Sequence, residues 1–156
     1  MGIEIERKFL TCSEAWRAEV VRSRQMRQGY LQRTENSAIR VRVCDGKAHI
    51  NIKQTDDGIH RLEYEYDIPL ADAGEILDRL SIAPLIEKTR HEVKVGHHLW
   101  EIDEFHGDNQ GLVVAEIELA AADEAFERPD WIGEEVSDDR RYFNSNLILH
   151  PYKDWR

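Results

Sequence analysis

The sequence has little of several features that mark common classes of protein. It has only two cysteines, Cys12 and Cys44, and no C-x-x-C pair, so neither a thiolate zinc site nor a disulfide is expected. We expect both to be small, partly buried side chains. It also lacks a run of about 18 apolar residues, so no membrane-spanning helix is predicted. Its first residues do not show the basic segment followed by an apolar one that is typical of a signal peptide. A cytoplasmic protein without a membrane partner is therefore expected.

The two common glycine-rich phosphate loops, G-x-x-x-x-G-K-[ST] and G-x-G-x-x-G, are also missing. Any bound phosphate would therefore be held by side chains. Lysine and arginine number 21 against 31 aspartates and glutamates, for a formal net charge of −10. This balance argues against nucleic acid as the partner. An anionic substrate would have to meet a local concentration of basic side chains inside an acidic protein.

No internal repeat, low-complexity segment or linker divides the chain, so residues 1–156 are expected to form a single domain. Alternation of apolar and polar residues is typical of strands with two unlike faces. It predicts strands at 3–10, 28–34, 38–44, 47–54, 61–68, 86–95, 98–105 and 112–119. Hairpin turns are predicted at Asp45-Gly46, Asp57-Gly58 and Gly96-His97, because glycine accepts positive φ.

Helical spacing is confined to a few segments. It predicts helices at 13–24, 71–80 and 121–127, and a fourth after Ser137 towards Leu149. Eight antiparallel strands with few helices predict a mainly β fold (α+β), in which a closed eight-stranded barrel leaves no exposed sheet edge. The helices carry apolar stripes and are expected to pack on the outside of this barrel.

Charge lies on one face of most predicted strands. In the first strand Glu4, Glu6 and Lys8 stand in one row, while Arg7 points to the other face. Seven of the eight strands repeat this alternation. The acids on the charged face are Glu4, Glu6, Glu63, Glu65, Asp103, Glu116 and Glu118, and the bases are Lys8, Arg40, Arg42, Lys53, Lys88 and Arg90.

Alternation alone does not decide which face of the strands points inward. In the ordinary arrangement the apolar face forms the core and the charged face meets water. In the other, helices cover the apolar face outside and the charges line the interior, where they must be paired or bound to ions. Carboxylates suit Mg²⁺ or Mn²⁺, and lysine and arginine suit phosphoryl oxygens. A charged interior would therefore support metal-assisted phosphoryl transfer.

The charged motifs also follow a familiar order. After Glu4-Ile5-Glu6-Arg7-Lys8 come Gly29-Tyr30-Leu31, Arg40-Val41-Arg42, Ile52-Lys53, Glu63-Tyr64-Glu65, Glu87-Lys88-Thr89-Arg90, Glu101-Ile102-Asp103, Glu116-Ile117-Glu118 and a tail containing Tyr142-Phe143-Asn144-Ser145-Asn146-Leu147. The first motif is similar to the E-x-E-x-K signature of the CYTH superfamily, or triphosphate tunnel metalloenzymes. The chain resembles the compact bacterial members of this family over nearly its whole length.

The resemblance implies an eight-stranded antiparallel tunnel with the charged face inside. The metal ligands it implies are Glu4, Glu6, Glu116, Glu118 and Asp103, the last as a ligand or as a counter-charge. The phosphate-binding residues it implies are Lys8, Arg40, Arg42, Lys53, Lys88, Arg90 and, at one tunnel mouth, Arg140. Glu63 and Glu65 would support the metal site or pair with bases. Tyr30 and Lys88 are a candidate pair for activating water.

By the same resemblance, the expected activity is that of a metal-dependent triphosphatase using Mg²⁺ or Mn²⁺. Inorganic triphosphate is the favoured substrate, since a short chain leaves little material for recognising an organic group, and nucleoside and thiamine triphosphates are further candidates. One alternative is a class IV-type adenylate cyclase that converts ATP to cyclic AMP and pyrophosphate. Another is a polyphosphate-binding module without catalysis. The sequence leaves both a monomer and a homodimer open.

Overall fold

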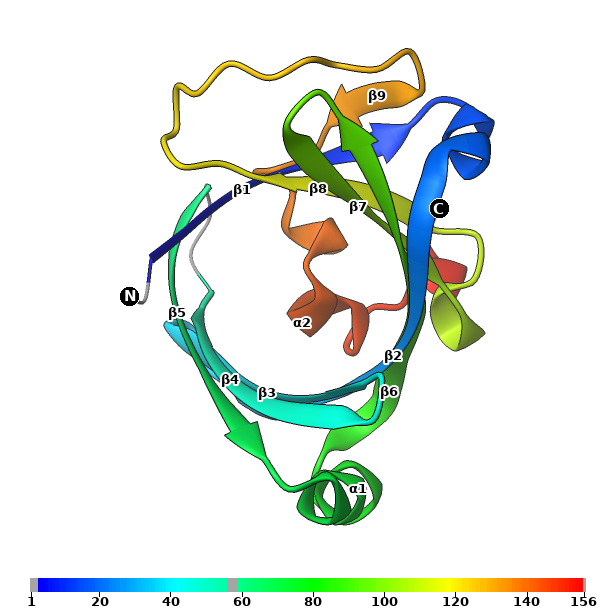
Figure 1. The fold of residues 1–156 in the computed structure, drawn as a ribbon. Coiled ribbons are helices and arrows are strands. Elements are labelled where there is room, and N and C mark those ends of the chain that lie inside the picture. The colour runs from blue at the N-terminus through cyan, green and yellow to red at the C-terminus, as the bar shows by residue number, and fades with distance from the viewer. Residues whose placement is uncertain (1–2, 56–58, 156) are drawn as a thin grey trace.

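In the computed structural model, which describes residues 3–55 and 59–155, eight of the strands close into an antiparallel barrel (Figure 1). These are β1 (Ile3–Thr11), β2 (Val20–Arg33), β3 (Ser37–Cys44), β4 (Lys47–Gln54), β5 (His60–Ile68), β6 (Ile82–Val95), β7 (His98–Phe105) and β8 (Val113–Glu118). They pair in the order β5-β4-β3-β2-β6-β7-β8-β1, and β5 pairs with β1 to close the ring. A further strand, β9 (Ile132–Glu135), pairs with the end of β1. The predicted fold class is confirmed.

The apolar face of β3 and β4 lies on the outside of the barrel. Helix α1 (Leu70–Arg79) begins after Pro69 and packs outside the ring, against these two strands (Figure 1). Its buried side chains Ala73 and Leu77 form one cluster with Val41 and Ala48. The helix predicted at 71–80 is therefore confirmed, with bounds shifted by one residue.

Aromatic side chains cover the outer face of the opposite part of the barrel. Trp100 of β7 meets Phe9 of β1 edge to face, with ring centroids 5.5 Å apart, and meets Trp131 at 5.8 Å. Such pairs stabilise by about 0.5–1.5 kcal/mol beyond the area that they bury. Trp16, fully buried, belongs to the same cluster. These two clusters thus lie outside the barrel wall, which leaves the charged face of the strands to line much of the interior.

The C-terminal segment returns to the barrel axis. A 3₁₀ helix (Arg140–Tyr142) leads into the short helix α2 (Asn144–Leu147), which lies within the ring in the view of Figure 1. Leu147 is fully buried and packs with Ile86 and Phe105 of the barrel strands. This segment therefore contributes side chains to the interior.

Three of the predicted helices differ from the structure. In 13–24 only Ala15–Glu19 is helical, as a 3₁₀ helix, and β2 begins at Val20 because residues 20–24 pair with β6. The segment 121–127 forms no helix, and the predicted fourth helix is broken at Phe143. Asp45 and the glycines at 46 and 96 have positive φ, as the predicted turns require. The turn predicted at Asp57-Gly58 lies outside the described residues.

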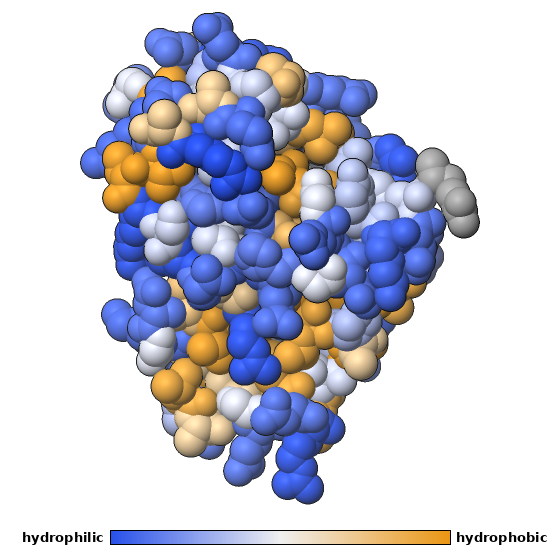
Figure 2. All heavy atoms as spheres, turned by 90° about the vertical axis from the view of Figure 1, so that its right-hand side faces the viewer, coloured by the Kyte–Doolittle hydropathy of each residue, from blue (hydrophilic) through white to orange (hydrophobic). Residues whose placement is uncertain are grey.

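The outer surface carries much of the remaining charge. On the face drawn in Figure 2, hydrophilic side chains predominate and hydrophobic ones appear in smaller groups between them. None of the helices formed by the described residues is long and apolar enough to cross a membrane.

Candidate active site

A cavity of about 180 Å³ lies in the barrel, and strand alternation points the predicted charged side chains into it. The predicted site residues that line it are Glu4, Glu6, Lys8, Tyr30, Arg40, Arg42, Lys53, Glu63, Glu65, Lys88, Arg90, Glu116 and Glu118. Asp103 and Arg140 are not among its lining residues. The structure thus brings together in one space nearly all of the residues selected from the sequence.

Acidic side chains crowd one wall of the cavity, on the adjacent strands β1, β8 and β7. Glu6 lies directly opposite Glu118, and Glu116 opposite Glu101. Like charges placed opposite each other on paired strands are destabilising. Burial raises the pKa of Glu118, and Glu4 and Glu6 add to this rise. These carboxylates form a donor set of hard oxygens that fits Mg²⁺ or Mn²⁺, whose charge would relieve the repulsion.

Basic side chains form the wall contributed by β3 and β6. Burial lowers the pKa of Arg42 to about 9, helped by the neighbouring charges of Arg40 and Arg90. The Nε atom of Arg40 is buried and has no hydrogen-bond partner among the described residues. A surplus of positive charge therefore faces the cavity on this side, and an anion with several oxygens would offset it.

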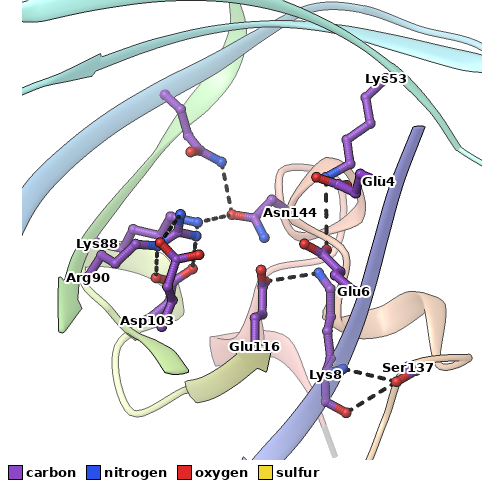
Figure 3. A network of polar contacts seen from close by, with 12 residues as sticks. Glu4, Glu6, Lys8, Lys53, Lys88, Arg90, Asp103, Glu116, Ser137 and Asn144 are labelled. Carbon is purple, nitrogen blue, oxygen red and sulfur yellow. Dashed lines mark hydrogen bonds and ion pairs between the residues drawn. The ribbon is translucent and has the colours of Figure 1, made fainter. Parts of the chain in front are cut away.

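Two lysines lie between the walls and hold acidic partners (Figure 3). The Nζ atom of Lys53 is 2.5 Å from Oε1 of Glu4 and 3.4 Å from Oε2 of Glu63. Burial opposes the charged form of Lys53, but Glu6 and Glu4 outweigh it and raise the pKa of the lysine. Lys8 Nζ lies 3.4 Å from Oε1 of Glu116. Both lysines are therefore in direct reach of the acidic wall.

Asp103 is a buried anchor for two of the bases. Its Oδ2 accepts a hydrogen bond from Lys88 Nζ at 2.8 Å, and its Oδ1 accepts one from Arg90 Nε at 2.8 Å (Figure 3). Burial raises the pKa of Asp103, but Arg90 and Lys88 outweigh it and lower that pKa to about 2. Because its oxygens are already bonded and it does not line the cavity, this carboxylate acts on the site through Lys88 and Arg90.

Lys88 is held from the other side by the C-terminal segment. Asn144 of α2 accepts hydrogen bonds on Oδ1 from Lys88 Nζ and from Gln28 Nε2, both at 2.9 Å. Gln28 in turn accepts one from Arg42 Nε at 3.0 Å. Burial lowers the pKa of Lys88 to about 7, and Arg90 and Arg42 add to the fall. Lys88 is therefore able to exchange a proton near neutral pH.

Two of the residues expected to act in the site, Arg140 and Tyr30, differ in their positions. Arg140 is exposed and lines a separate groove with Arg7 and Glu135. Tyr30 lines the cavity, but within the described part of the chain no hydrogen bond joins it to Lys88.

Sequence reasoning left out several residues of the cavity and its supporting network, among them Glu101, Arg61, Asn144 and Gln28. Glu101 shares a strand face with Asp103, and Arg61 shares one with Glu63, so alternation alone could have included them. Asn144 and Gln28 carry no charge. Asn144 lies in the tail motif but was given no role, and Gln28 belongs to none of the motifs.

Comparison with known proteins agrees with this geometry. The family model of the CYTH domain matches residues 2–146. The chain is 46% identical over 156 residues to an inorganic triphosphatase of Acetivibrio thermocellus, covering 100% of this chain and 99% of the relative. It is 35% identical over 150 residues to an inorganic triphosphatase of Nitrosomonas europaea, covering 94% and 97%. A crystal structure of an inorganic triphosphatase superposes with a TM-score of 0.66 at 33% identity, covering 94% of each chain. The chain belongs to the CYTH family.

Proposed function

We propose that this protein is a divalent-metal-dependent enzyme that hydrolyses inorganic triphosphate. The observation that carries the proposal is the division of one buried cavity into an acidic wall and a basic wall. Metal-assisted phosphoryl transfer needs both, because catalysis is mainly positioning and neutralisation of charge. The proposal is supported by the two curated relatives, each an inorganic triphosphatase.

The size and lining of the cavity favour an inorganic substrate over a nucleotide. Pockets for organic ligands of drug size enclose roughly 300–1,000 Å³ and are mostly apolar, whereas this cavity encloses about 180 Å³ and is lined chiefly by charged side chains. Its two aromatic lining residues, Tyr30 and Phe143, are both almost fully buried. The charged cavity therefore offers a nucleobase only these two rings, which disfavours an adenylate cyclase.

The acidic wall would hold the cation. Glu4, Glu6, Glu116 and Glu118 are the proposed ligands of Mg²⁺ or Mn²⁺, and Glu101 is added to them because it faces Glu116. Glu63 and Glu65 would supply supporting negative charge. When bound, the cation supplies neutralisation of phosphoryl oxygens and a lowered pKa for a coordinated water.

The basic wall would bind and orient the triphosphate. Arg40, Arg42 and Arg90 offer forked N–H donors to phosphoryl oxygens, and Lys8 and Lys53 offer point charges beside the acidic wall. Asp103 keeps Lys88 and Arg90 in place. Attack of water in line on a terminal phosphorus would break one P–O bond and release orthophosphate and pyrophosphate.

The attacking water has to lose a proton to a base in the cavity. Lys88, with a pKa near neutrality, and Tyr30 are the proposed candidates for accepting it. A lysine can serve as a base only in its neutral form, whereas phosphate binding requires the ammonium form. The two roles of Lys88 therefore predict opposite pH dependence.

The test is a substrate panel with purified protein. Inorganic triphosphate, ATP and thiamine triphosphate are each incubated with Mg²⁺ or with Mn²⁺, and orthophosphate, pyrophosphate and cyclic AMP are measured. We expect orthophosphate and pyrophosphate from inorganic triphosphate. Formation of cyclic AMP from ATP would support the cyclase instead, and saturable binding of triphosphate without turnover would support a binding module.

Substitutions in the acidic wall test the proposed metal ligands. Glu4→Gln and Glu6→Gln remove charge with little change in shape, and we expect each to lower turnover by at least about 100-fold while triphosphate binding persists. The control is Glu14→Gln, whose side chain is 66% exposed. Wild-type turnover in both wall variants would contradict the assignment.

A further inference from the structure

A buried guanidinium lines the cavity outside the set of bases assigned to phosphate so far. Arg61 lies on β5 on the same strand face as Glu63 and is only 6% exposed. Its Cα is the partner of that of Glu4 on β1. Arg61 therefore stands beside the acidic wall, away from the basic wall that β3 and β6 form.

Among the described residues no carboxylate forms an ion pair with Arg61, although Glu6 lies close enough to feel its charge. Within the described residues, none of the ion pairs or hydrogen bonds of the barrel includes its guanidinium, and its Nε is buried without a hydrogen-bond partner. The neighbouring acids Glu4 and Glu63 are engaged by Lys53 instead. A buried charge is costly unless something pairs with it. The cavity onto which Arg61 opens is the space from which a partner would come.

The contact that Arg61 does make leaves its donors free. Its Cζ lies 4.1 Å from the ring centroid of Phe143, and Nζ of Lys8 lies 5.3 Å from the same ring. Phe143 precedes α2 and is 4% exposed. Stacking occupies the flat face of a guanidinium, whereas its N–H donors lie in the plane of the group. The ring therefore holds Arg61 in position without satisfying its hydrogen bonds.

From this geometry we infer that Arg61, stacked on Phe143 and accompanied by Lys8, is a further phosphoryl-binding residue of the cavity. The inference rests on the proposed function for the identity of its ligand, inorganic triphosphate. A phosphoryl group presents two oxygens at the spacing of the guanidinium fork and would place negative charge directly against a guanidinium that forms no ion pair with the described carboxylates. Because Arg61 lies beside Glu4, the phosphoryl group that it binds would be the one next to the acidic wall.

The test compares binding in the absence of turnover. Calorimetric titration with inorganic triphosphate in EDTA is carried out on wild type, Arg61→Gln, Arg61→Lys and Phe143→Leu. We expect Arg61→Gln to weaken binding about 10- to 100-fold, as loss of charge-assisted hydrogen bonds does, and Arg61→Lys to weaken it less. Phe143→Leu should weaken it about threefold to tenfold, because the ring no longer orients the guanidinium. The control is Arg22→Gln, whose side chain is 56% exposed and pairs with Asp45.

A second measurement separates ligand binding from a structural role. The thermal midpoint of ligand-free Arg61→Gln should equal or exceed that of wild type, because an unpaired buried charge has been removed. The inference would be overturned if Arg61→Gln bound triphosphate as tightly as wild type or the Arg22→Gln control. This holds whether or not the ligand-free midpoint of Arg61→Gln is lowered. Wild-type protein that binds triphosphate but does not hydrolyse it with Mg²⁺ would defeat the proposed function only, since the calorimetric comparison requires no turnover.

Discussion

Glu6 of β1 and Glu118 of β8 lie directly opposite each other on paired antiparallel strands. Two carboxylates in this position repel each other, and burial together with Glu4 and Glu6 raises the pKa of Glu118. A barrel selected for stability alone would place opposite charges there, as it does with Lys8 and Glu116 in the same strand pair. The proposed cation would relieve this repulsion, which would link the metal site to the stability of the barrel.

Glu118→Gln should therefore stabilise the metal-free protein. Removing a like-charge pair contributes about 0.2–1 kcal/mol, which for a chain of this size raises the thermal midpoint by up to about 4 °C. The same change should reduce the rise in midpoint that Mg²⁺ or Mn²⁺ gives to wild type, since one ligand is lost. Thermal denaturation in EDTA and with each cation measures both effects. A lower midpoint in EDTA would show that Glu118 stabilises the barrel without metal.

Lys88 gives a pH dependence of activity with a definite sign. Its pKa is lowered to about 7, first by burial, so the ammonium form is present below that pH and lost above it. In its hydrogen bonds to Asp103 and Asn144, the ammonium group of Lys88 is the donor. We therefore expect kcat/KM to fall about tenfold per pH unit above about 7. The fall should be absent in Lys88→Arg, which stays charged. A rise through the same range in wild type would instead favour Lys88 as the base.

Asn144 provides an independent test of which group titrates. In Asn144→Asp an ionised carboxylate would replace the amide oxygen that accepts from Lys88 at 2.9 Å. An adjacent negative charge favours the ammonium form, so the break in the pH profile should move upward by about one unit or more. Asn146→Asp, two residues further along α2, is the control. An unchanged break would assign the titration to a different residue.

The strands and the charged residues could be predicted because both follow from local alternation. The register that sets Arg40 and Arg42 on one face is a property of consecutive residues, and it holds in the barrel. Which face points inward depends on what covers the other side, and that is settled by distant packing such as α1 against β3 and β4. From the sequence, only the family resemblance indicated that the charged face points inward.

The errors have the same physical origin. Trp16 and Val20 are spaced as on one face of a helix, but both join the outer aromatic cluster, one from a 3₁₀ helix and one from β2. Their spacing reflects contact with the same aromatic cluster, and such contact does not require a helix. Asn144 reaches Lys88 because the C-terminal segment returns into the barrel, 56 residues later in the chain. No local pattern reports a contact at that separation.

Gly29 of β2 is predicted to be required for packing against α1 and β6. A Cβ atom there would lie 2.8 Å from Leu85 Cδ2 and 2.9 Å from both Leu77 Cδ2 and Ser81 Cβ. Overpacking of this kind costs about 1–3 kcal/mol, so Gly29→Ala should lower the thermal midpoint by roughly 2–12 °C. The matched control is Gly74→Ala in α1, where a Cβ meets nothing within 4 Å and better helix propensity should raise the midpoint. Equal midpoints in the two variants would contradict the packing argument.

Arg7, on the opposite face of β1 from the cavity, should govern stability at acidic pH through Glu135. The Glu135 carboxylate accepts from Arg7 Nη2 at 2.6 Å and Nε at 2.9 Å. Arg7 thereby lowers the pKa of Glu135 below its ordinary 4.5, against a smaller opposing effect of burial. A lowered carboxyl pKa stabilises the fold above the ordinary value, and this stabilisation is lost as the pH falls through the lowered one.

Glu135→Gln tests this pair. Because both side chains are partly exposed, the expected loss at about pH 7 is on the order of 1 kcal/mol, or roughly 2–4 °C in thermal midpoint. As the pH falls below 4.5 and through the lowered pKa, wild-type Glu135 becomes protonated, and the difference between the two proteins should shrink towards zero. The control is Glu134→Gln, an exposed neighbour on β9. A difference that stays constant from about pH 7 to about pH 2 would mean that the charge of Glu135 contributes nothing and that the amide fails for another reason, such as its fit beside Ser137.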